Sequence, residues 1–330
     1  MKITVTMPLN ESQRTKLEAA APGAEFLYCV PMEKAQEAVT MKAMLECQTQ
    51  EQFADAEVIL GNVKPRFLAG AKSLKWLQLN NAGTEGFCDG ALPEGAILTN
   101  ATGAYGLAIS EHMIGMLFEL RKKLHLYRDN QSEHLWRSEG HVGVIEGTTV
   151  LVLGLGDIGT TFARKMKALG CYTIGVKRRP GACPAGVDEL HLLEDLDELL
   201  PRADVVALSM PGNAQTRHTL DGRRLGLLKE NAVILNVGRG SAIDTDALTE
   251  ALQAGKIAGA GLDVTDPEPL PSDHPLWEAP GVVITPHVSG GFSLPETLEK
   301  IVDICAENLI RYQKGEPLRN VVDLETGYCK

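Results

Sequence analysis

A glycine-rich turn in the middle of the chain constrains the fold more than any other feature. The residues Gly154-Leu155-Gly156-Asp157-Ile158-Gly159 follow the apolar run Val150 to Leu153 and precede a segment of helical periodicity, Thr161 to Leu169. A buried strand, a tight glycine turn and a helix in this order form a cradle for a dinucleotide pyrophosphate, because glycines let the backbone approach phosphate and the helix N-terminus offers N–H groups. We expect the cofactor contacts of this turn to come from Gly154, Gly156, Asp157, Ile158 and Gly159.

The next predicted strand, Cys171 to Val176, ends in a cluster of cations. NAD sites usually place Asp or Glu about twenty residues after the glycine turn, where the carboxylate binds the ribose 2′-OH. Here Lys177, Arg178 and Arg179 occupy that position. Three cations suit a 2′-phosphate and offer nothing to a 2′-OH, so the sequence predicts NADP(H). NAD(H) is the alternative cofactor if this segment is an ordinary basic surface turn.

The position of the glycine turn indicates two domains. Residues 1–149 precede the strand that leads into it, and 330 residues exceed the size at which a single core usually divides. Strand and helix signals alternate on both sides of the turn, which is typical of parallel sheets covered by helices. We predict an α/β protein of two doubly wound parallel-sheet domains. A Rossmann cofactor domain, 103–292, is inserted into a flavodoxin-like substrate domain, 1–102 plus 293–330.

Local patterns predict several elements within these domains. Asn10 and Gln13 form a capping box that starts a helix ended by Pro22-Gly23, and Ser293 with Glu296 starts the last helix. Apolar residues at helical spacing predict one long helix from Tyr105 to Tyr127. Further buried strands are predicted at 3–7, 57–61, 76–79, 203–208, 232–236, 259–263 and 282–285.

Composition excludes several classes of function. A net charge of −11 disfavours binding to nucleic acid or anionic membranes, and no apolar run approaches the ~20 residues of a membrane span. Residues 1–5 are typical of a first strand and lack the apolar stretch of a signal peptide. The seven cysteines are scattered without a CxxC pair, which favours reduced thiols, and no histidines have metal-ligand spacing. We therefore expect a cytoplasmic protein without a metal.

Three polar segments follow predicted strands of the second domain, at the edge where doubly wound sheets bind ligands. Residues 236–240 contain Arg239, residues 263–269 contain Glu268, and residues 285–291 contain His287. Taken singly, each has an ordinary interpretation: a surface arginine in a glycine turn, a solvated loop acid and a histidine at a strand end.

Together and in this order, these segments closely resemble the D-isomer-specific 2-hydroxyacid dehydrogenases. The resemblance covers most of the chain. It is carried by the glycine turn, Gly238-Arg239-Gly240, Asp266-Pro267-Glu268-Pro269, Thr285-Pro286-His287-Val288-Ser289-Gly290, Ala82-Gly83 and Ile109-Ser110-Glu111-His112. It implies a catalytic group of Arg239, Glu268 and His287, whereas His112 is expected to be structural. It also implies cofactor contacts from Ser209, Met210, Pro211, Thr216, Val237, Gly238, Asp263 and Gly290.

This residue set suits the reduction of a 2-oxo acid. An adjacent carboxylate favours the protonated imidazole, so His287 beside Glu268 can donate a proton to the developing alkoxide. Arg239 offers a planar fork that matches a carboxylate and a carbonyl oxygen. Substrate contacts are expected from Arg239 and His287, completed across a cleft by the backbone N–H groups of Asn81, Ala82 and Gly83.

The predicted activity is NADPH-dependent reduction of a small 2-oxo acid, such as glyoxylate or hydroxypyruvate, to the D-2-hydroxy acid. Formate dehydrogenases are rejected because they carry an amide where Glu268 stands. An NAD-dependent phosphoglycerate dehydrogenase-like enzyme is the nearest alternative, although the basic residues 177–179 and the short segment after His287 weigh against it. A dinucleotide-sensing, corepressor-like interaction protein is a more distant alternative. The resemblance also suggests a homodimer formed through the cofactor domains and residues 105–145, with Trp136 in a dimer arm.

Overall fold

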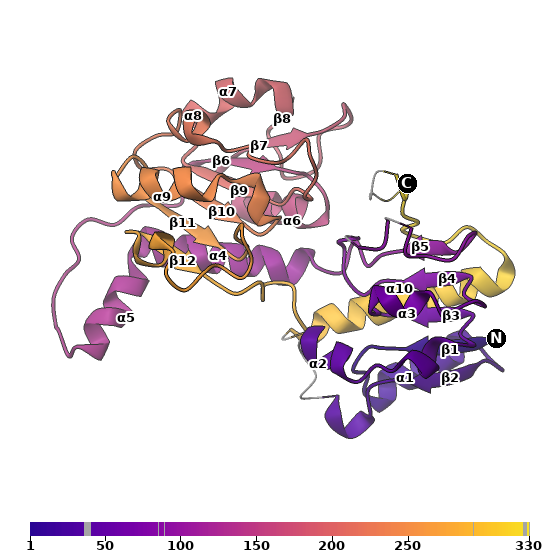
Figure 1. Cartoon of the computed structure of the whole chain (residues 1–330). Helices are drawn as coiled ribbons and strands as arrows, with labels where there is room; N and C mark the ends of the chain where they lie inside the picture. Colours follow the sequence, from indigo (N-terminus) through magenta and orange to yellow (C-terminus); the bar gives the residue numbers. More distant parts are fainter. Residues whose placement is uncertain (36–40, 85, 89, 293, 326–328, 330) are drawn as a thin grey trace. The chain divides into compact units, whose positions relative to one another are not determined.

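The computed structural model describes residues 1–35, 41–84, 86–88, 90–292, 294–325 and 329, and these form two compact units (Figure 1). The first unit comprises residues 1–105 and 291–330, and the second comprises residues 106–290. Within the described residues, the first unit has a five-stranded sheet and the second a seven-stranded sheet, and every strand pairing is parallel. The predicted class, an α/β protein of two doubly wound parallel sheets, is confirmed.

The sheet of the first unit has the strand order β2-β1-β3-β4-β5, which is the flavodoxin-like order. Its strands are β1 (Lys2–Val5), β2 (Glu25–Tyr28), β3 (Val58–Leu60), β4 (Trp76–Gln78) and β5 (Ile97–Thr99). Its helices are α1 (Glu11–Ala20), η1 (Met32–Lys34), α2 (Met41–Glu46), η2 (Gln50–Phe53), α3 (Pro65–Leu68) and α10 (Pro295–Lys314). The helices α1 and α10 pack together on one face, where Tyr312 stacks on Trp76, and η2 and α3 cover the other face.

The start of α1 confirms the predicted capping box. Asn10 Oδ1 accepts a hydrogen bond from Gln13 N at 2.9 Å, and Gln13 Oε1 accepts one from Asn10 N at 3.0 Å. The helix ends at Ala20, just before Pro22-Gly23. The cap predicted at Ser293 lies outside the described residues, and α10 begins at Pro295.

A buried polar network joins α10 to the sheet of the first unit. The Asn308 side chain is fully buried; its Nδ2 donates to Gln78 Oε1 at 2.9 Å and to Arg319 O at 3.0 Å. Its Oδ1 accepts from Arg319 N at 2.7 Å. Gln78 Oε1 also accepts from the Thr99 hydroxyl at 2.7 Å. Because buried polar groups are costly when unpaired, this network determines how α10 sits on β4 and β5.

Replacing Asn308 with alanine is expected to destabilise the chain by about 3 kcal/mol or more, because three hydrogen bonds are lost and buried partners stay unpaired. Urea-induced unfolding measures the change. Asp303→Asn is the matched control, since Asp303 lies on the same helix in an exposed ion pair with Lys16, and exposed pairs contribute only ~0–1 kcal/mol. Equal midpoints for Asn308→Ala and wild type would contradict the prediction.

The sheet of the second unit has the order β12-β11-β10-β9-β6-β7-β8, a Rossmann arrangement extended by one strand. Its strands are β6 (Thr149–Leu153), β7 (Tyr172–Lys177), β8 (Glu189–Leu192), β9 (Val205–Leu208), β10 (Val233–Asn236), β11 (Gly259–Leu262) and β12 (Val282–Ile284). Its helices are α4 (Gly106–Lys122), α5 (Leu124–Ser132), α6 (Asp157–Ala168), η3 (Leu193–Asp195), α7 (Leu196–Leu199), η4 (Leu200–Arg202), α8 (Gly222–Leu225), η5 (Gly240–Ala242), α9 (Thr245–Gln253) and η6 (Pro275–Glu278).

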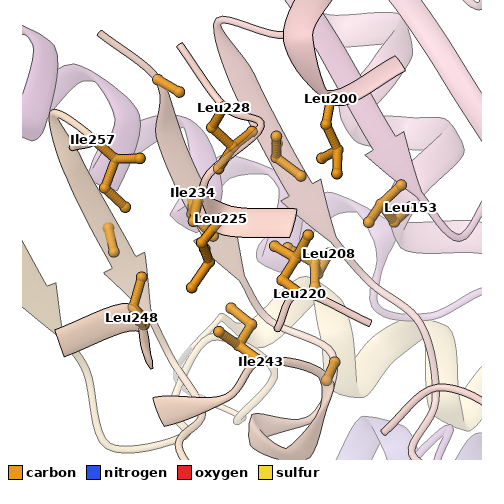
Figure 2. Packing of buried hydrophobic residues seen from close by; sticks show 14 of the residues in the cluster. Leu153, Leu200, Leu208, Leu220, Leu225, Leu228, Ile234, Ile243, Leu248 and Ile257 are labelled. Atoms are coloured by element: carbon orange, nitrogen blue, oxygen red, sulfur yellow. The ribbon is translucent and has the colours of Figure 1, made fainter. Parts of the chain in front are cut away.

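Helices cover both faces of this second sheet. The helices α4 and α6 pack against each other and against the strands on one face. On the other face, α7, α8 and α9 close a core in which side chains from helices and strands point toward one another, including Leu225, Ile234 and Leu248 (Figure 2). The strands carry mostly buried Val, Ile, Leu and Ala because both faces are covered.

The prediction of one long helix from Tyr105 to Tyr127 is wrong in one respect, because the structure has two helices there. Lys123 adopts a left-handed backbone with φ of 58°, and this residue separates α4 from α5. The buried apolar face ends at Leu120, whereas Leu124 is exposed, so packing on the sheet stops just before the break. Beyond it, α5 projects away from the sheet, and the chain returns through residues 133–148 (Figure 1).

Candidate active site

The glycine turn connects β6 to α6, and two of its glycines are required by packing within the second unit. Gly154 has φ of +95°, and a Cβ there would lie 3.1 Å from Met210 N. A Cβ on Gly159 would lie 1.9 Å from Gly154 O, which is too close for any other residue. These two glycines therefore allow the strand, the turn and the helix to pack tightly.

Gly156 is different, because a Cβ at this position would meet no heavy atom of the chain within 4 Å. It is the N-cap of α6, whose first N–H groups have no partner within the helix. Open space in front of a helix N-terminus fits an anionic group such as a pyrophosphate. Asp157, the first residue of α6, has a further role, since its Oδ2 accepts from Gly106 N at 2.7 Å and so joins the starts of α4 and α6.

The two kinds of glycine predict different mutant behaviour. Gly156→Ala is expected to leave the melting temperature unchanged and to weaken NADPH binding about tenfold, the loss of roughly one hydrogen bond. Gly159→Ala is expected to lower stability by about 1–3 kcal/mol, because the turn must shift, and also to weaken NADPH binding. Thermal melting without ligand and a fluorescence titration with NADPH separate the two effects. Unchanged NADPH affinity in both variants would contradict this use of the turn.

The basic segment lies beside the glycine turn. Gly154 N donates to Val176 O at 3.1 Å, so the residues that follow β7 begin next to the turn. Lys177 Nζ donates to Ala182 O at 2.9 Å, which holds the loop after β7, and Arg178 and Arg179 are exposed. The three cations thus lie at the same edge of the sheet as the N-terminus of α6.

The loops after β9 and β10 complete this edge. Ser209 Oγ donates to Gly154 O at 2.8 Å, and Thr216 Oγ1 donates to Pro211 O at 2.8 Å. After β10, Val237 is buried, and a Cβ on Gly238 would lie 2.5 Å from Met210 O. Ser209 and Met210 therefore pack against Gly154 of the glycine turn, and Gly238 packs in turn against Met210.

Arg239 follows in the turn after β10. Its backbone is extended, its Nη1 donates to Gly238 O at 2.7 Å, and Asn236 Nδ2 donates to Arg239 O at 3.0 Å. A Cβ on the next residue, Gly240, would lie 1.9 Å from Thr265 O. The turn that carries Arg239 thus packs against the segment that leads to Glu268.

Glu268 and His287 are in direct contact. His287 Nδ1 lies 2.7 Å from Glu268 Oε1, and both side chains are a little under half exposed. This distance is that of a strong, charge-assisted hydrogen bond in which the ring donates from Nδ1. The imidazole therefore has one nitrogen held by a carboxylate and presents Nε2 in another direction.

The loop that carries His287 is held by Asp263, at the end of β11. The Asp263 carboxylate is buried and accepts hydrogen bonds from Thr285 Oγ1 at 2.6 Å, Val288 N at 2.9 Å and Ser289 N at 3.1 Å, and from the Ser289 hydroxyl. Thr285 and Ser289 were not predicted as site residues, although both stand in the motif that contains His287. Gly290 follows at the end of this loop.

The predicted substrate residues Asn81, Ala82 and Gly83 belong to the first unit and follow β4. Ala101 N donates to Asn81 O at 2.9 Å, and Asn100 Nδ2 donates to Ala82 O at 2.8 Å. Asn81 Oδ1 is buried and has no hydrogen-bond partner among the described residues. The segment is thus anchored through its carbonyl groups.

The described residues include neither a candidate metal site nor a helix able to cross a membrane. They contain no group of three or more His, Cys, Asp or Glu side chains arranged to hold a metal ion. Likewise, none of the described helices combines the length and apolar character needed to cross a membrane.

Comparison with known proteins identifies the family. The model of the D-isomer specific 2-hydroxyacid dehydrogenase NAD binding domain matches residues 114–289. The chain belongs to this family. It is accordingly an oxidoreductase that uses NAD(P) and acts on the CH–OH group of D-2-hydroxy acids.

Two curated relatives illustrate the range of this dehydrogenase family. A D-3-phosphoglycerate dehydrogenase from Methanocaldococcus jannaschii is 30% identical over 98% of this chain, but the match spans only 60% of that relative's length. A glyoxylate reductase from Thermofilum pendens is 30% identical over 68% of each chain.

Solved structures of the family share the fold along almost the whole chain. A D-isomer specific 2-hydroxyacid dehydrogenase family protein from Aeromonas salmonicida is 32% identical, with a TM-score of 0.82 over 98% of this chain and 99% of that one. A second dehydrogenase, from Xanthobacter autotrophicus and crystallised with NADPH and MES, is 27% identical, with a TM-score of 0.79 over 99% of each chain.

Proposed function

We propose that the chain reduces a small 2-oxo acid, of the glyoxylate or hydroxypyruvate type, to the D-2-hydroxy acid with NADPH. The observation that carries the proposal is the 2.7 Å contact between His287 Nδ1 and Glu268 Oε1. With Nδ1 donating to the carboxylate, Nε2 is the ring nitrogen that can pass a proton to a substrate oxygen. Bound nicotinamide supplies the hydride.

The other polar groups receive roles that follow from their chemistry. Arg239 binds the substrate carboxylate through its planar guanidinium and polarises the carbonyl oxygen. Glu268 accepts a hydrogen bond from Nδ1 and so orients the His287 ring. Residues 1–102 with 293–330 form the proposed substrate domain, in which the N–H groups of residues 81–83 complete carboxylate binding, and residues 103–292 form the proposed cofactor domain.

The preference for NADPH over NADH rests on Lys177, Arg178 and Arg179. These cations follow β7, next to the glycine turn, and a 2′-phosphate is an anion that arginine binds in a bidentate manner. The Xanthobacter autotrophicus relative crystallised with NADPH supports this choice. NAD(H) binding remains the alternative. The remaining cofactor contacts are assigned to the loops after β6, β9, β10, β11 and β12.

Phosphoglycerate dehydrogenase is the second candidate activity, and the relative from Methanocaldococcus jannaschii favours it by matching 98% of this chain. That reaction uses a phosphorylated substrate with NAD. The basic residues after β7 weigh against it, because they suit the 2′-phosphate of the other cofactor.

The proposed partners are the small-molecule acids and a second copy of the chain. Leu135, Trp136, Val142 and Val144 are exposed apolar residues in the segment that follows α5, and Trp136 is fully exposed. Exposed apolar side chains gathered in one segment are typical of a protein interface. We therefore propose a homodimer. Because free thiols are typical of reducing compartments, the seven free cysteines lead us to propose a cytoplasmic location as well.

A spectrophotometric panel tests the proposed function. Loss of absorbance at 340 nm is followed for NADPH and NADH, each with glyoxylate, hydroxypyruvate, pyruvate, 3-phosphohydroxypyruvate and bulkier 2-oxo acids. We expect the highest kcat/KM with NADPH and glyoxylate or hydroxypyruvate. A preference for NADH with the phosphorylated acid would favour the phosphoglycerate dehydrogenase alternative. No turnover with any 2-oxo acid would refute both.

A further inference from the structure

A line of side chains connects helix α4 to the loop that carries His287. His112, on α4, places its Nε2 3.0 Å from Thr285 Oγ1. The Thr285 hydroxyl lies 2.6 Å from Asp263 Oδ1, and the Asp263 carboxylate is 1% exposed. Three elements of the second unit thus meet at this carboxylate: α4, the end of β11 and the end of β12.

The chemistry of the three groups determines which atom donates and which accepts in each hydrogen bond. A threonine hydroxyl has a single proton, and the 2.6 Å contact assigns that proton to the Asp263 carboxylate, the strongest acceptor present. Thr285 Oγ1 can then only accept from the ring, so His112 must carry its proton on Nε2. The same nitrogen lies 3.9 Å from Asp263 Oδ1, where its proton also favours the negative charge.

Asp263 also forms hydrogen bonds with the residues around His287. Its carboxylate accepts from the backbone N–H groups of Val288 and Ser289, and its backbone oxygen accepts from His287 N at 2.8 Å. His287 itself has φ of +54°, a left-handed conformation that residues other than glycine adopt only when their surroundings hold them in it. The hydrogen bonds to Asp263 hold His287 in this conformation.

We propose that His112 is a positioning residue for His287. By donating from Nε2 to Thr285, it keeps the threonine hydroxyl directed at Asp263, and the loop anchored on Asp263 keeps His287 turned toward Glu268. The inference rests on the proposed role of His287 as proton donor. It goes beyond the expectation that His112 is merely structural, because it predicts an effect on turnover that depends on one donated hydrogen bond.

Four variants test the link. His112→Phe keeps a ring but removes the donor, and it is expected to lower kcat about 10- to 100-fold, the range for a small misplacement of a catalytic group, with little change in KM. His112→Gln keeps a nitrogen donor at a similar reach and should restore most of kcat. Thr285→Val removes the acceptor and should resemble His112→Phe. The double variant His112→Phe/Thr285→Val should be no slower than Thr285→Val, because both changes break the same line.

Hydrogen exchange supplies a readout that does not depend on turnover. The amides of residues 287–289 are expected to exchange faster in His112→Phe and Thr285→Val than in wild type, but not in His112→Gln. Glu111→Gln is the matched control: Glu111 precedes His112 on α4 and makes an exposed ion pair with Lys165 at 2.9 Å. It should change neither exchange nor kcat.

Three results would overturn the proposal: normal kcat in both His112→Phe and Thr285→Val, losses that add in the double variant, or a His112→Gln variant as slow as Thr285→Val. The last comparison holds even if His112→Phe does not fold. Failure here is distinct from failure of the proposed function. If His287→Ala keeps its turnover, the proton donor is wrong; if His287→Ala is inactive and His112→Phe is normal, only the positioning role is wrong.

Discussion

Replacing His287 with alanine is expected to lower kcat for 2-oxo acid reduction by about 10²- to 10⁴-fold, because the developing alkoxide loses its positioned proton donor. NADPH affinity should change little, since the imidazole is assigned to the substrate oxygen. Glu268→Gln should give a smaller loss, because an amide oxygen can still accept from Nδ1, although in a weaker hydrogen bond that is not charge-assisted. Steady-state rates at 340 nm and a fluorescence titration with NADPH provide the two measurements.

The chain offers a matched control for this prediction. His191, on β8, also contacts a carboxylate, with its Nε2 3.0 Å from Glu189 Oε2, but it lies on the edge strand at the far side of the sheet from β12. His191→Ala should keep normal turnover. Comparable rates for His287→Ala and His191→Ala would refute the catalytic role of His287.

Changing both Arg178 and Arg179 to alanine is expected to weaken NADPH binding and to leave NADH binding nearly unchanged. Each lost charge-assisted contact to the 2′-phosphate costs about 1.5–3 kcal/mol, so the pair should cost at least tenfold in Kd, and about 100-fold or more if both arginines contribute fully. Because NADH lacks this phosphate, the ratio of the two affinities should fall by the same factor. Titrations of both cofactors, done at one salt concentration, measure it.

Arg223→Ala is the control for general charge effects. Arg223 is an exposed arginine of the same unit, paired with Asp197 at 2.7 Å, and it should not discriminate between the cofactors. Equal losses of NADPH and NADH affinity in the Arg178/Arg179 variant would contradict the phosphate contact. In that case the segment would be an ordinary basic turn, and NADH would become the expected cofactor.

Most of the strands that the sequence predicted are buried on both faces; β12, a partly buried edge strand, was predicted from its apolar run Val282–Ile284. Strands β6, β9 and β10 are continuous apolar runs because helices cover them on both sides. The strands that sequence analysis missed, β2, β5 and β8, all lie at a sheet edge. β2 and β8 have no fully buried residue, and β5 is three residues long. β8, Glu189-Leu190-His191-Leu192, alternates polar and apolar residues and so lacks the continuous apolar run of a buried strand.

The break between α4 and α5 had no sequence signal either. Lys123 is neither glycine nor proline, and the apolar spacing continues through Leu124. The end of α4 is instead determined by tertiary contacts: the buried Arg121 donates from Nη1 to Asn231 O at 2.9 Å and from Nη2 to Asp204 O at 2.7 Å. Contacts between residues about 80 to 110 positions apart leave no trace in local periodicity.

The candidate site likewise has features that local sequence predicts and features that it does not. The glycine turn could be predicted from local sequence, because strand, turn and helix follow one another directly. The contact between Glu268 and His287 joins residues 19 positions apart on two loops, and only the resemblance to a family pointed to it. The line from His112 through Thr285 to Asp263 spans 173 positions, so it could be found only from coordinates.

The most direct test of the central claim is a crystal structure of the chain with NADPH and oxamate, a 2-oxo acid analogue that cannot be reduced. We expect the oxamate carboxylate to contact the Arg239 guanidinium and its carbonyl oxygen to lie within hydrogen-bond distance of His287 Nε2, with Nδ1 still on Glu268. Oxamate bound away from these residues, or an imidazole turned away from it, would contradict the roles proposed for Arg239 and His287.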